Sequence, residues 1–320
     1  MAEPLSTRQL NSPIQPPGGL EVEQQPRVPT RHPWRWLAVI LILLVLASLL
    51  RSAFTNPNFE WSVVWGYVFD SRILAGLRTT LILTAVSMAL AFVIGLGLAT
   101  MRLSENPVLR WVASLYIWAF RGTPILLQLL IWYNLAALYP VIALGVPFGP
   151  ALFEWNANTL ITVWVAAILG LALNEAAYLA EIIRGGIISV DKGQTEAAKA
   201  LGMSETLAFR RIVLPQALRV IVPPLSNETI GLLKYSSIVS VITLPELLYS
   251  GQLIYARTYQ TIPVLLAVSI WYLVVTSILT IGEHLIERRL ATGWAEPRAH
   301  EQGLDGTKQG RWPGWLSFDR

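Results

Sequence analysis

The sequence of 320 residues has no cysteine, three histidines and few charged side chains. Without cysteine there are no disulfides, thiolate nucleophiles or cysteine-ligated metals, and the redox compartment cannot be read. His32, His284 and His300 are scattered without the spacing of metal ligands. Only 14% of the residues are charged, whereas a soluble domain carries about a quarter. A water-soluble enzyme is therefore not expected, and we predict neither a metal site nor catalytic residues.

Apolar residues are abundant instead, at 54% of the chain. The 24 Lys and Arg residues exceed the 20 Asp and Glu residues by four, which is too small a surplus at this length to indicate nucleic-acid binding. The composition therefore predicts one polytopic membrane domain rather than two soluble domains.

Uncharged intervals locate the membrane-spanning helices. A charge at the bilayer centre costs about 2.5 to 3.5 kcal/mol, and about 20 apolar residues cross the hydrocarbon. Intervals of this kind follow Arg78, Arg121, Glu154 and Arg257. A shorter apolar run lies between two arginines that can snorkel to the interface, and it also counts as a helix. The six predicted spans are residues 34–53, 74–101, 111–140, 159–184, 219–243 and 262–287.

Two of these spans and one connection between spans have particular features. The first span has the alternative of a signal peptide, but its leader is long and no small-x-small cleavage site follows it. The fifth carries Glu228 and Lys234, and Pro223 and Pro224 fit its start or a kink. The connection 141–158 has no Lys or Arg but remains apolar, so we expect a short helix or re-entrant turn against the outer membrane face.

Basic residues predict the orientation. If the N-terminus is cytosolic, most of the 24 basic residues lie in segments that face the cytosol. Because Lys and Arg are more frequent in cytosolic loops, both termini are predicted to be cytosolic. Residues 1–33 are rich in proline, and residues 291–320 are rich in glycine and charge. Both segments are predicted to be disordered tails.

The only long internal polar loop, residues 185–216, predicts a helical hairpin at the cytosolic surface. Thr195 or Asp191 can cap a short helix that Gly202 ends in a left-handed conformation. Ser204 can cap a second helix, 205–213, which Pro215 is expected to stop.

The same loop carries a family resemblance. Glu196-Ala197-Ala198, then Gly202, Ile212 and Leu214-Pro215 at their spacing resemble the loop motif of permease subunits in binding-protein-dependent ABC importers. Further residues are similar to the subfamily that takes up polar amino acids such as histidine, glutamine, glutamate and arginine: Arg121-Gly122-Thr123-Pro124 with Leu127 and Gln128; Tyr178, Glu181 and Arg184; and Pro224, Asn227, Lys234, Ser236 and Ser237. The resemblance covers about residues 70–290, and the helix at 34–53 and both tails depart from it.

The resemblance implies an all-α polytopic protein of the cell inner membrane, with about six transmembrane helices: a core of five plus one N-terminal helix. It implies transport of a polar L-amino acid by alternating access. Its expected partners are an ABC ATPase subunit dimer, a second permease that is a copy or a paralogue, an extracytoplasmic amino acid-binding protein and membrane lipids, with no nucleic acid. No lysine follows a glycine anywhere, so the chain lacks a phosphate-binding loop. ATP and Mg are therefore expected in the partner ATPase, and no cofactor in this chain.

The resemblance also implies roles in the hairpin. Glu196 orients it, Ala197 and Ala198 make the close contact with the ATPase, and Gly202 sets the angle between the two helices. An ordinary interhelical loop is the alternative; it explains Gly202 and Pro215 but not the run of alanines.

Ionisable groups at membrane depth are functional hypotheses by default. We hypothesise a polar passage lined by Glu175, Tyr178, Asn227, Glu228, Lys234 and Ser237, into which helices with proline-marked starts direct their positive ends. Three alternatives remain open: Glu181 forms an interfacial ion pair with Arg184, Glu228 and Lys234 neutralise each other, and Arg121 only snorkels where Gly122-Thr123-Pro124 breaks the helix.

Two other functions fit the sequence less well. A channel or ion-driven carrier working alone leaves the hairpin without a purpose. An intramembrane enzyme needs a Ser-His, paired Asp or His-Asp constellation within the spans, and only His284, beside Glu283, lies near one.

Overall fold

The structure is a computed structural model that describes residues 33–146 and 149–291. Except for Pro33 and Ala291, the predicted tails 1–33 and 291–320 lie outside the described residues. The chain divides between Pro57 and Asn58 into two units.

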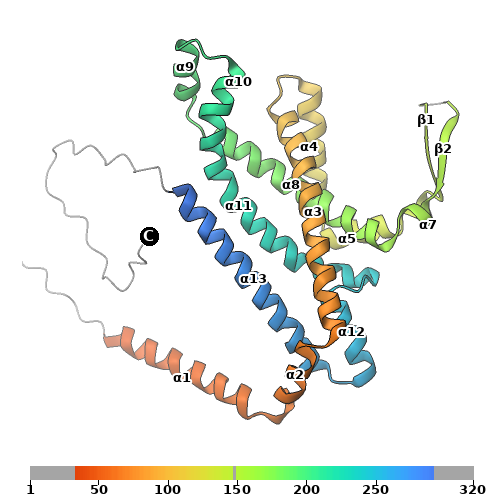
Figure 1. Cartoon of the computed structure of the whole chain (residues 1–320), viewed down its shortest axis with the longest axis vertical. Coiled ribbons are helices and arrows are strands. Elements are labelled where there is room, and N and C mark those ends of the chain that lie inside the picture. Colours follow the sequence, from red (N-terminus) through yellow and green to blue (C-terminus); the bar gives the residue numbers. More distant parts are fainter. Residues whose placement is uncertain (1–32, 147–148, 292–320) are drawn as a thin grey trace, which may run out of the picture. The chain divides into compact units, whose positions relative to one another are not determined.

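Helices make up nearly all of the described structure (Figure 1). They are α1 (Pro33–Thr55), η1 (Pro57–Phe59), α2 (Trp61–Val68), α3 (Ser71–Leu103), α4 (Pro107–Gly122), α5 (Ile125–Tyr133), α6 (Leu135–Leu138), α7 (Ala157–Leu160), α8 (Val163–Ile188), α9 (Lys192–Ala200), α10 (Glu205–Ala208), η2 (Phe209–Val213), α11 (Leu214–Tyr235), η3 (Ser236–Ile242), α12 (Leu247–Thr258) and α13 (Thr261–Ala291). Two strands, β1 (Val141–Gly145) and β2 (Ala151–Asn156), form one antiparallel hairpin.

The helices confirm the expected number of spans. Four helices, α1, α3, α8 and α13, are long and apolar enough to cross a membrane. Two bent pairs, α4 with α5 and the 205–242 segment with α12, raise the number to six if each pair counts as one span. An all-α polytopic membrane fold is therefore correct, with the β hairpin as a small exception.

The third span is not the single helix predicted over residues 111–140. It breaks at Thr123 and Pro124, and α5 leaves α4 at an angle of 102°. Pro124 has no N–H to continue the helix, and the residue before a proline is driven to extended backbone, as the Thr123 angles φ −118° and ψ 145° show.

The connection between the third and fourth spans was also predicted wrongly. Instead of a short helix or re-entrant turn, Val141–Gly145 and Ala151–Asn156 form the paired strands β1 and β2, and a single helical turn, α7, follows. Apolar and polar residues alternate from Phe153 to Asn156, and this period-2 pattern favours a strand.

The fifth span begins earlier than predicted, and its prolines do not occupy the predicted positions in the helix. Pro223 and Pro224 lie inside α11 rather than at its start. Pro215 does not stop the second helix of the hairpin: the wide turn η2 carries the chain into α11, and Pro215 follows that turn as the second residue of α11. Helices α2 and α12 were not predicted, because they are too short to register as spans.

The fold is centred on α8, which packs against α3, α4, α5 and α11. Of its apolar stretch 61% is buried, compared with 33% for α3 and 17% for α13. Its buried face is mostly alanine and glycine, which let neighbouring helices approach closely in a membrane. Tyr116 of α4 donates a hydrogen bond of 2.8 Å to the carbonyl oxygen of Leu173, which adds a polar tie to this contact.

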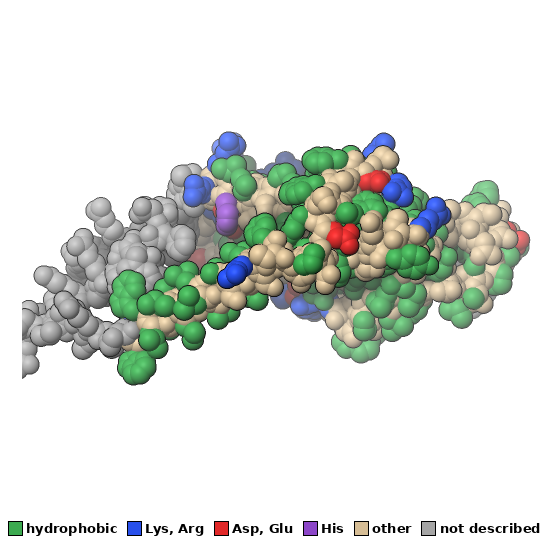
Figure 2. Space-filling view, turned by 90° about the horizontal axis from the view of Figure 1, so that it is seen from below, with side chains coloured by type: hydrophobic (Ala, Val, Ile, Leu, Met, Phe, Trp, Pro, Cys, Tyr) green, Lys and Arg blue, Asp and Glu red, His purple; other side chains and the backbone are tan. Residues whose placement is uncertain are grey.

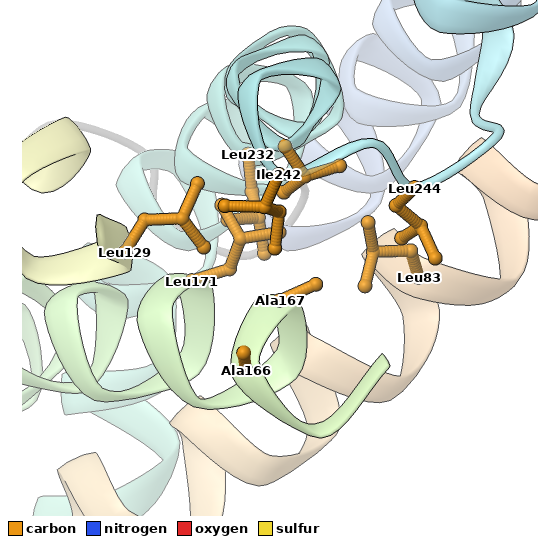
Figure 3. Close-up of a cluster of buried hydrophobic side chains, with 9 residues drawn as sticks. Leu83, Leu129, Ala166, Ala167, Leu171, Leu232, Ile242 and Leu244 are labelled. Carbon is orange, nitrogen blue, oxygen red and sulfur yellow. The ribbon is translucent and has the colours of Figure 1, made fainter. Parts of the chain in front are cut away.

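Beside α8 a cluster of buried apolar side chains joins α3, α5, α11 and η3 (Figure 3). Leu129 of α5 lies against Gly170 of α8, where a Cβ atom would be 2.9 Å from the leucine Cδ1 atom. The bent helix α5 is thus packed directly on the central helix.

Buried Glu246 fixes the second break, between η3 and α12. Its carboxylate caps α12 by accepting hydrogen bonds from the N–H groups of Leu248 at 2.9 Å and Tyr249 at 2.7 Å. It also accepts bonds from Tyr272 of α13 at 3.1 Å and Thr80 of α3 at 3.4 Å. One side chain therefore ties three helices together at the turn.

The outward faces of the helices are strongly apolar. Leu273, Ile278 and Ile281 of α13 are exposed, and so are Phe92 and Val93 of α3. Figure 2 shows hydrophobic side chains spread over the face seen there, with few charges among them. Such a surface requires lipid or another apolar partner.

Two glycines of α3 make a matched stability test. A Cβ atom on Gly76 would lie 2.9 Å from the backbone oxygen of Glu246, whereas one on Gly97 would meet nothing within 4 Å. We expect Gly76→Ala to destabilise the protein by about 1 to 3 kcal/mol through overpacking, and Gly97→Ala to be neutral or stabilising by up to about 1 kcal/mol. Thermal unfolding in detergent measures both. Equal shifts in Tm would show that α12 is not packed on α3 as described.

Candidate functional site

A polar cavity of about 480 Å³ lies between the α4–α5 break, the middle of α8 and α11. Its volume falls in the range of small-molecule sites. The lining residues are Arg121, Gly122, Thr123, Pro124 and Ile125 from the break, Asn174, Glu175 and Tyr178 from α8, and Glu228 and Tyr235 from α11.

Two amide side chains form hydrogen bonds with the groups that the break between α4 and α5 leaves free. Gln128 donates hydrogen bonds to the Phe120 carbonyl at 2.9 Å and to the Thr123 hydroxyl at 2.7 Å. Asn174 of α8 donates to the same Phe120 carbonyl at 2.9 Å and to the Gln128 side-chain oxygen at 3.1 Å. Carbonyls freed by the break are therefore satisfied within the protein, as apolar surroundings require.

The break also directs a helix start into the cavity. Ile125, the first residue of α5, lines it, so the free N–H groups of the first turn bring partial positive charge there. The sequence predicted this role for Pro223 and Pro224, but in the structure the proline that marks a helix start at the cavity is Pro124.

Three charged side chains face this space. Glu175 is 4% exposed, and its Oε1 atom has no hydrogen-bond partner among the described residues. Glu228 is half-buried. The Arg121 guanidinium lies 5.0 Å from the centre of the Tyr178 ring, in a cation–π contact. With both carboxylates ionised, the cavity carries a net charge of about −1.

The structure brings together half of the predicted passage. Glu175, Tyr178 and Glu228 line the cavity, and Asn227, Lys234 and Ser237 do not. Asn227 precedes Glu228 and so points about 100° away from it on α11, while Ser237 donates to the Lys234 carbonyl at 2.8 Å.

Glu228 and Lys234 are six residues apart on one helix and point in widely different directions, and no ion pair joins them.

The predicted set of passage residues missed Arg121, Asn174 and Tyr235. Two signals were available: the Arg-Gly-Thr-Pro motif, and the spacing of four residues between Asn174 and Tyr178.

A second polar group lies towards the other end of α8. Glu181 pairs with Arg184 at 2.7 Å, which confirms the expected ion pair, and it also lies 3.4 Å from Arg102 of α3. Arg102 donates a further hydrogen bond of 2.6 Å to Ser114 of α4. This group joins three helices, as expected of an ion pair that fixes helix packing.

The predicted helical hairpin is present as α9 and α10. Asp191, not Thr195, caps α9, and Ser204 caps α10 through the Leu207 N–H at 3.4 Å. Gly202 has φ +77°, so the expected left-handed end of the first helix is confirmed. Lys199 and Glu205 form an ion pair of 3.0 Å across the bend.

The four predicted coupling residues differ in exposure. Glu196 and Ala197 are exposed, while Ala198 is 1% exposed and packs inside the hairpin, where its carbonyl accepts a bond of 3.1 Å from the Met203 N–H. Leu201 is 82% exposed. The surface that a partner can contact therefore contains Ala197 and Leu201 rather than Ala198.

The chain belongs to the family of binding-protein-dependent transport system inner membrane components, whose pattern matches residues 91–292. This membership confirms the resemblance of the loop motif. The chain is therefore a transport component of the inner membrane.

Individual relatives cover most of the chain. It is 43% identical over 283 residues to the arginine transport system permease protein ArgU of Corynebacterium glutamicum, covering 87% of this chain and 88% of that protein. It is 37% identical over 238 residues to the probable amino-acid ABC transporter permease protein YckA of Bacillus subtilis, covering 72% of this chain and 97% of that protein. A crystal structure of an amino acid ABC transporter with histidines is similar at 37% identity with a TM-score of 0.59, over 68% of this chain and 94% of that chain.

Proposed function

We propose that this chain is the membrane-spanning permease subunit of an ABC importer for a polar L-amino acid, which it moves by alternating access. The unpartnered Glu175 oxygen at the edge of a polar cavity carries the proposal, because a buried carboxylate without a partner is costly unless a ligand satisfies it.

The cavity suits an amino acid with a cationic side chain. The α5 start and Arg121 supply positive charge for the α-carboxylate, and Glu175 and Glu228 supply negative charge for the basic groups. The relative that transports arginine supports this preference.

The α9–α10 hairpin would dock in a groove of a separate ATPase dimer, which uses ATP and Mg while this chain binds no cofactor. Ala197 and Leu201 would make the contact, and Gly202 would set the angle between the helices. Ala198 would hold the hairpin together from within. A hairpin with this surface has no purpose in a channel or carrier that works alone.

Membership of the family supports the remaining proposed partners. A second permease, a copy or a paralogue, would complete the pathway, and an extracytoplasmic binding protein would deliver the amino acid. The hairpin and both termini would be cytosolic in the inner membrane, since the basic residues gather on that side.

Reconstituted uptake tests the proposed function. Proteoliposomes that contain this permease with its partner subunits, the ATPase and the binding protein should accumulate arginine only with ATP on the ATPase side. Liposomes without the ATPase should not. Uptake that persists in its absence would contradict the importer and favour a carrier.

Removing one charge from the cavity tests the substrate preference. Glu175→Gln keeps the shape but loses the negative charge, so arginine uptake should fall about tenfold or more, equivalent to about 1.4 kcal/mol, with a smaller change for glutamine. Glu105→Gln, an exposed carboxylate in the connection between α3 and α4, is the matched control and should behave as wild type. Equal loss for both amino acids would refute charge selection by Glu175.

Gly202 offers a conformational test of coupling. Its φ of +77° disfavours β-branched residues, whereas asparagine tolerates it, and no atom would obstruct a Cβ there. Gly202→Val should uncouple ATP turnover from uptake, while Gly202→Asn should retain most of the coupled activity. The ratio of amino acid transported to ATP hydrolysed is the measurement. A valine variant with a wild-type ratio would show that the bend does not matter for coupling.

A further inference from the structure

A cleft of about 340 Å³ lies between the start of α3 and α12. It shares no lining residue with the polar cavity described above, so it is a separate site. Two arginines and two hydroxyl groups line it together with apolar side chains: Arg72, Ala75 and Thr79 from α3, and Ser250, Leu253 and Arg257 from α12. Its volume lies at the lower end of the range of small-molecule sites.

Both arginines lie at the same end of this cleft, because α3 and α12 run in opposite directions. A Cβ atom on Gly76 of α3 would lie 2.8 Å from the Cβ atom of Ser250 of α12. Further along α3, the Thr80 hydroxyl accepts a hydrogen bond of 3.0 Å from the N–H of Leu247, which precedes Ser250. The arginine of α3 comes before Gly76 and the arginine of α12 comes after Ser250. The cleft is therefore basic at one end and mainly apolar beyond it.

The basic end carries about one net positive charge. Arg72 donates hydrogen bonds to the two carboxylate oxygens of Asp70, at 3.0 Å and 2.7 Å. These bonds hold the pKa of the Asp70 carboxyl below its usual range, so this pair stays ionised and adds no net charge. Arg257 is exposed, and within the described part of the chain its guanidinium has neither a hydrogen bond nor an ion pair. A phosphodiester group, with one negative charge, complements this end.

The depth of the arginines matches a lipid headgroup. Between Arg78 and Arg102 the 23 residues of α3 are uncharged, and they rise about 36 Å, close to the thickness of the hydrocarbon of about 30 Å. Arg72 lies about 9 Å before Arg78 along the helix, which places it in the headgroup layer. In Figure 1 α12 lies at the end of the bundle away from α9 and α10, so this leaflet is the one opposite the coupling hairpin.

An apolar stripe on α3 continues from the cleft towards the middle of the membrane. Ala75, Thr79, Ile82 and Val86 follow one another at intervals of three or four residues and so share one face of the helix. Ile82 and Val86 are 42% and 44% exposed. An acidic side chain of a soluble protein would complement the arginines but would leave this stripe uncovered, whereas a phospholipid covers both.

We propose that the cleft binds an anionic phospholipid, with its phosphate between Arg72 and Arg257 and one acyl chain along the stripe on α3. Arginine suits this role because its planar fork of N–H groups matches a phosphate. The bound lipid links the start of α3 to the end of α12. This proposal does not depend on which substrate the protein transports.

Quenching of a fluorophore by labelled lipids tests the proposal, and the natural lack of cysteine makes single-site labelling direct. Ile82→Cys places the fluorophore on the apolar stripe. Leu81→Cys is the matched control, at the same depth and equally 42% exposed but on another face of α3. The labelled full chain is assembled with its partner subunits in vesicles. The quencher is a nitroxide on the acyl chain of phosphatidylglycerol, which is anionic, or of phosphatidylcholine, which has no net charge.

At position 82 we expect phosphatidylglycerol to bind about fivefold more strongly than phosphatidylcholine, equivalent to about 1 kcal/mol. At position 81 the two lipids should quench equally. Arg257→Gln should abolish the preference at position 82. Arg78→Gln, which removes an exposed arginine of α3 outside the cleft, should leave the preference unchanged.

Equal quenching by the two lipids at position 82 would overturn the proposal, and so would equal loss of the preference in both arginine variants, which indicates diffuse attraction. No quenching by either lipid at position 82 would overturn it in favour of a protein that covers the cleft. Loss of the preference in excess free sn-glycerol 3-phosphate would show a site for a soluble phosphate rather than a lipid. Because the readout is lipid binding, failure of transport in the same vesicles leaves the test intact.

Discussion

A membrane-spanning helix can break only where the protein itself satisfies the backbone groups that the break releases. At the α4–α5 break this is done by Gln128 and Asn174, which share the Phe120 carbonyl. Because the break is held in this way, α5 departs at 102° and its start reaches the cavity beside Arg121. The site depends on these two amides as much as on its charged residues.

The carboxylates within the helical core differ in their hydrogen-bond and ion-pair partners. Glu246 caps α12 and is bonded from two further helices, and Glu181 is paired with two arginines. Both therefore hold helices together. Glu175 is buried like Glu246, but neither a hydrogen bond nor an ion pair is found for its Oε1 atom among the described residues, whereas Oε1 of Glu181, which also lacks a hydrogen bond, lies 3.4 Å from Arg102. This contrast, rather than burial alone, separates a residue available to a ligand from residues that stabilise the fold.

Several features could be predicted from the sequence because they depend on local chemistry. Uncharged apolar runs located the spans, Gly202 and Ser204 marked the hairpin, and the spacing of Glu181 and Arg184 predicted their ion pair. Other predictions were wrong where the same local sequence feature is compatible with more than one structure. A proline can start, bend or lie within a helix: Pro124 starts α5, whereas Pro223 and Pro224 are carried inside α11. The apolar segment 141–156 satisfied the expectation of a membrane-facing helix but forms strands.

By itself the sequence determined that this is a polytopic membrane protein with a capped polar hairpin, since hydropathy, charge and capping act over a few neighbouring residues. Only the tertiary structure decided which polar residues meet. Glu175 and Glu228 come from different helices, and Arg121 reaches them because the chain bends at Pro124. Packing likewise turned Ala198 inward and left Ala197 and Leu201 exposed. Such choices depend on how α8 packs against its neighbours, and no short stretch of sequence contains that information.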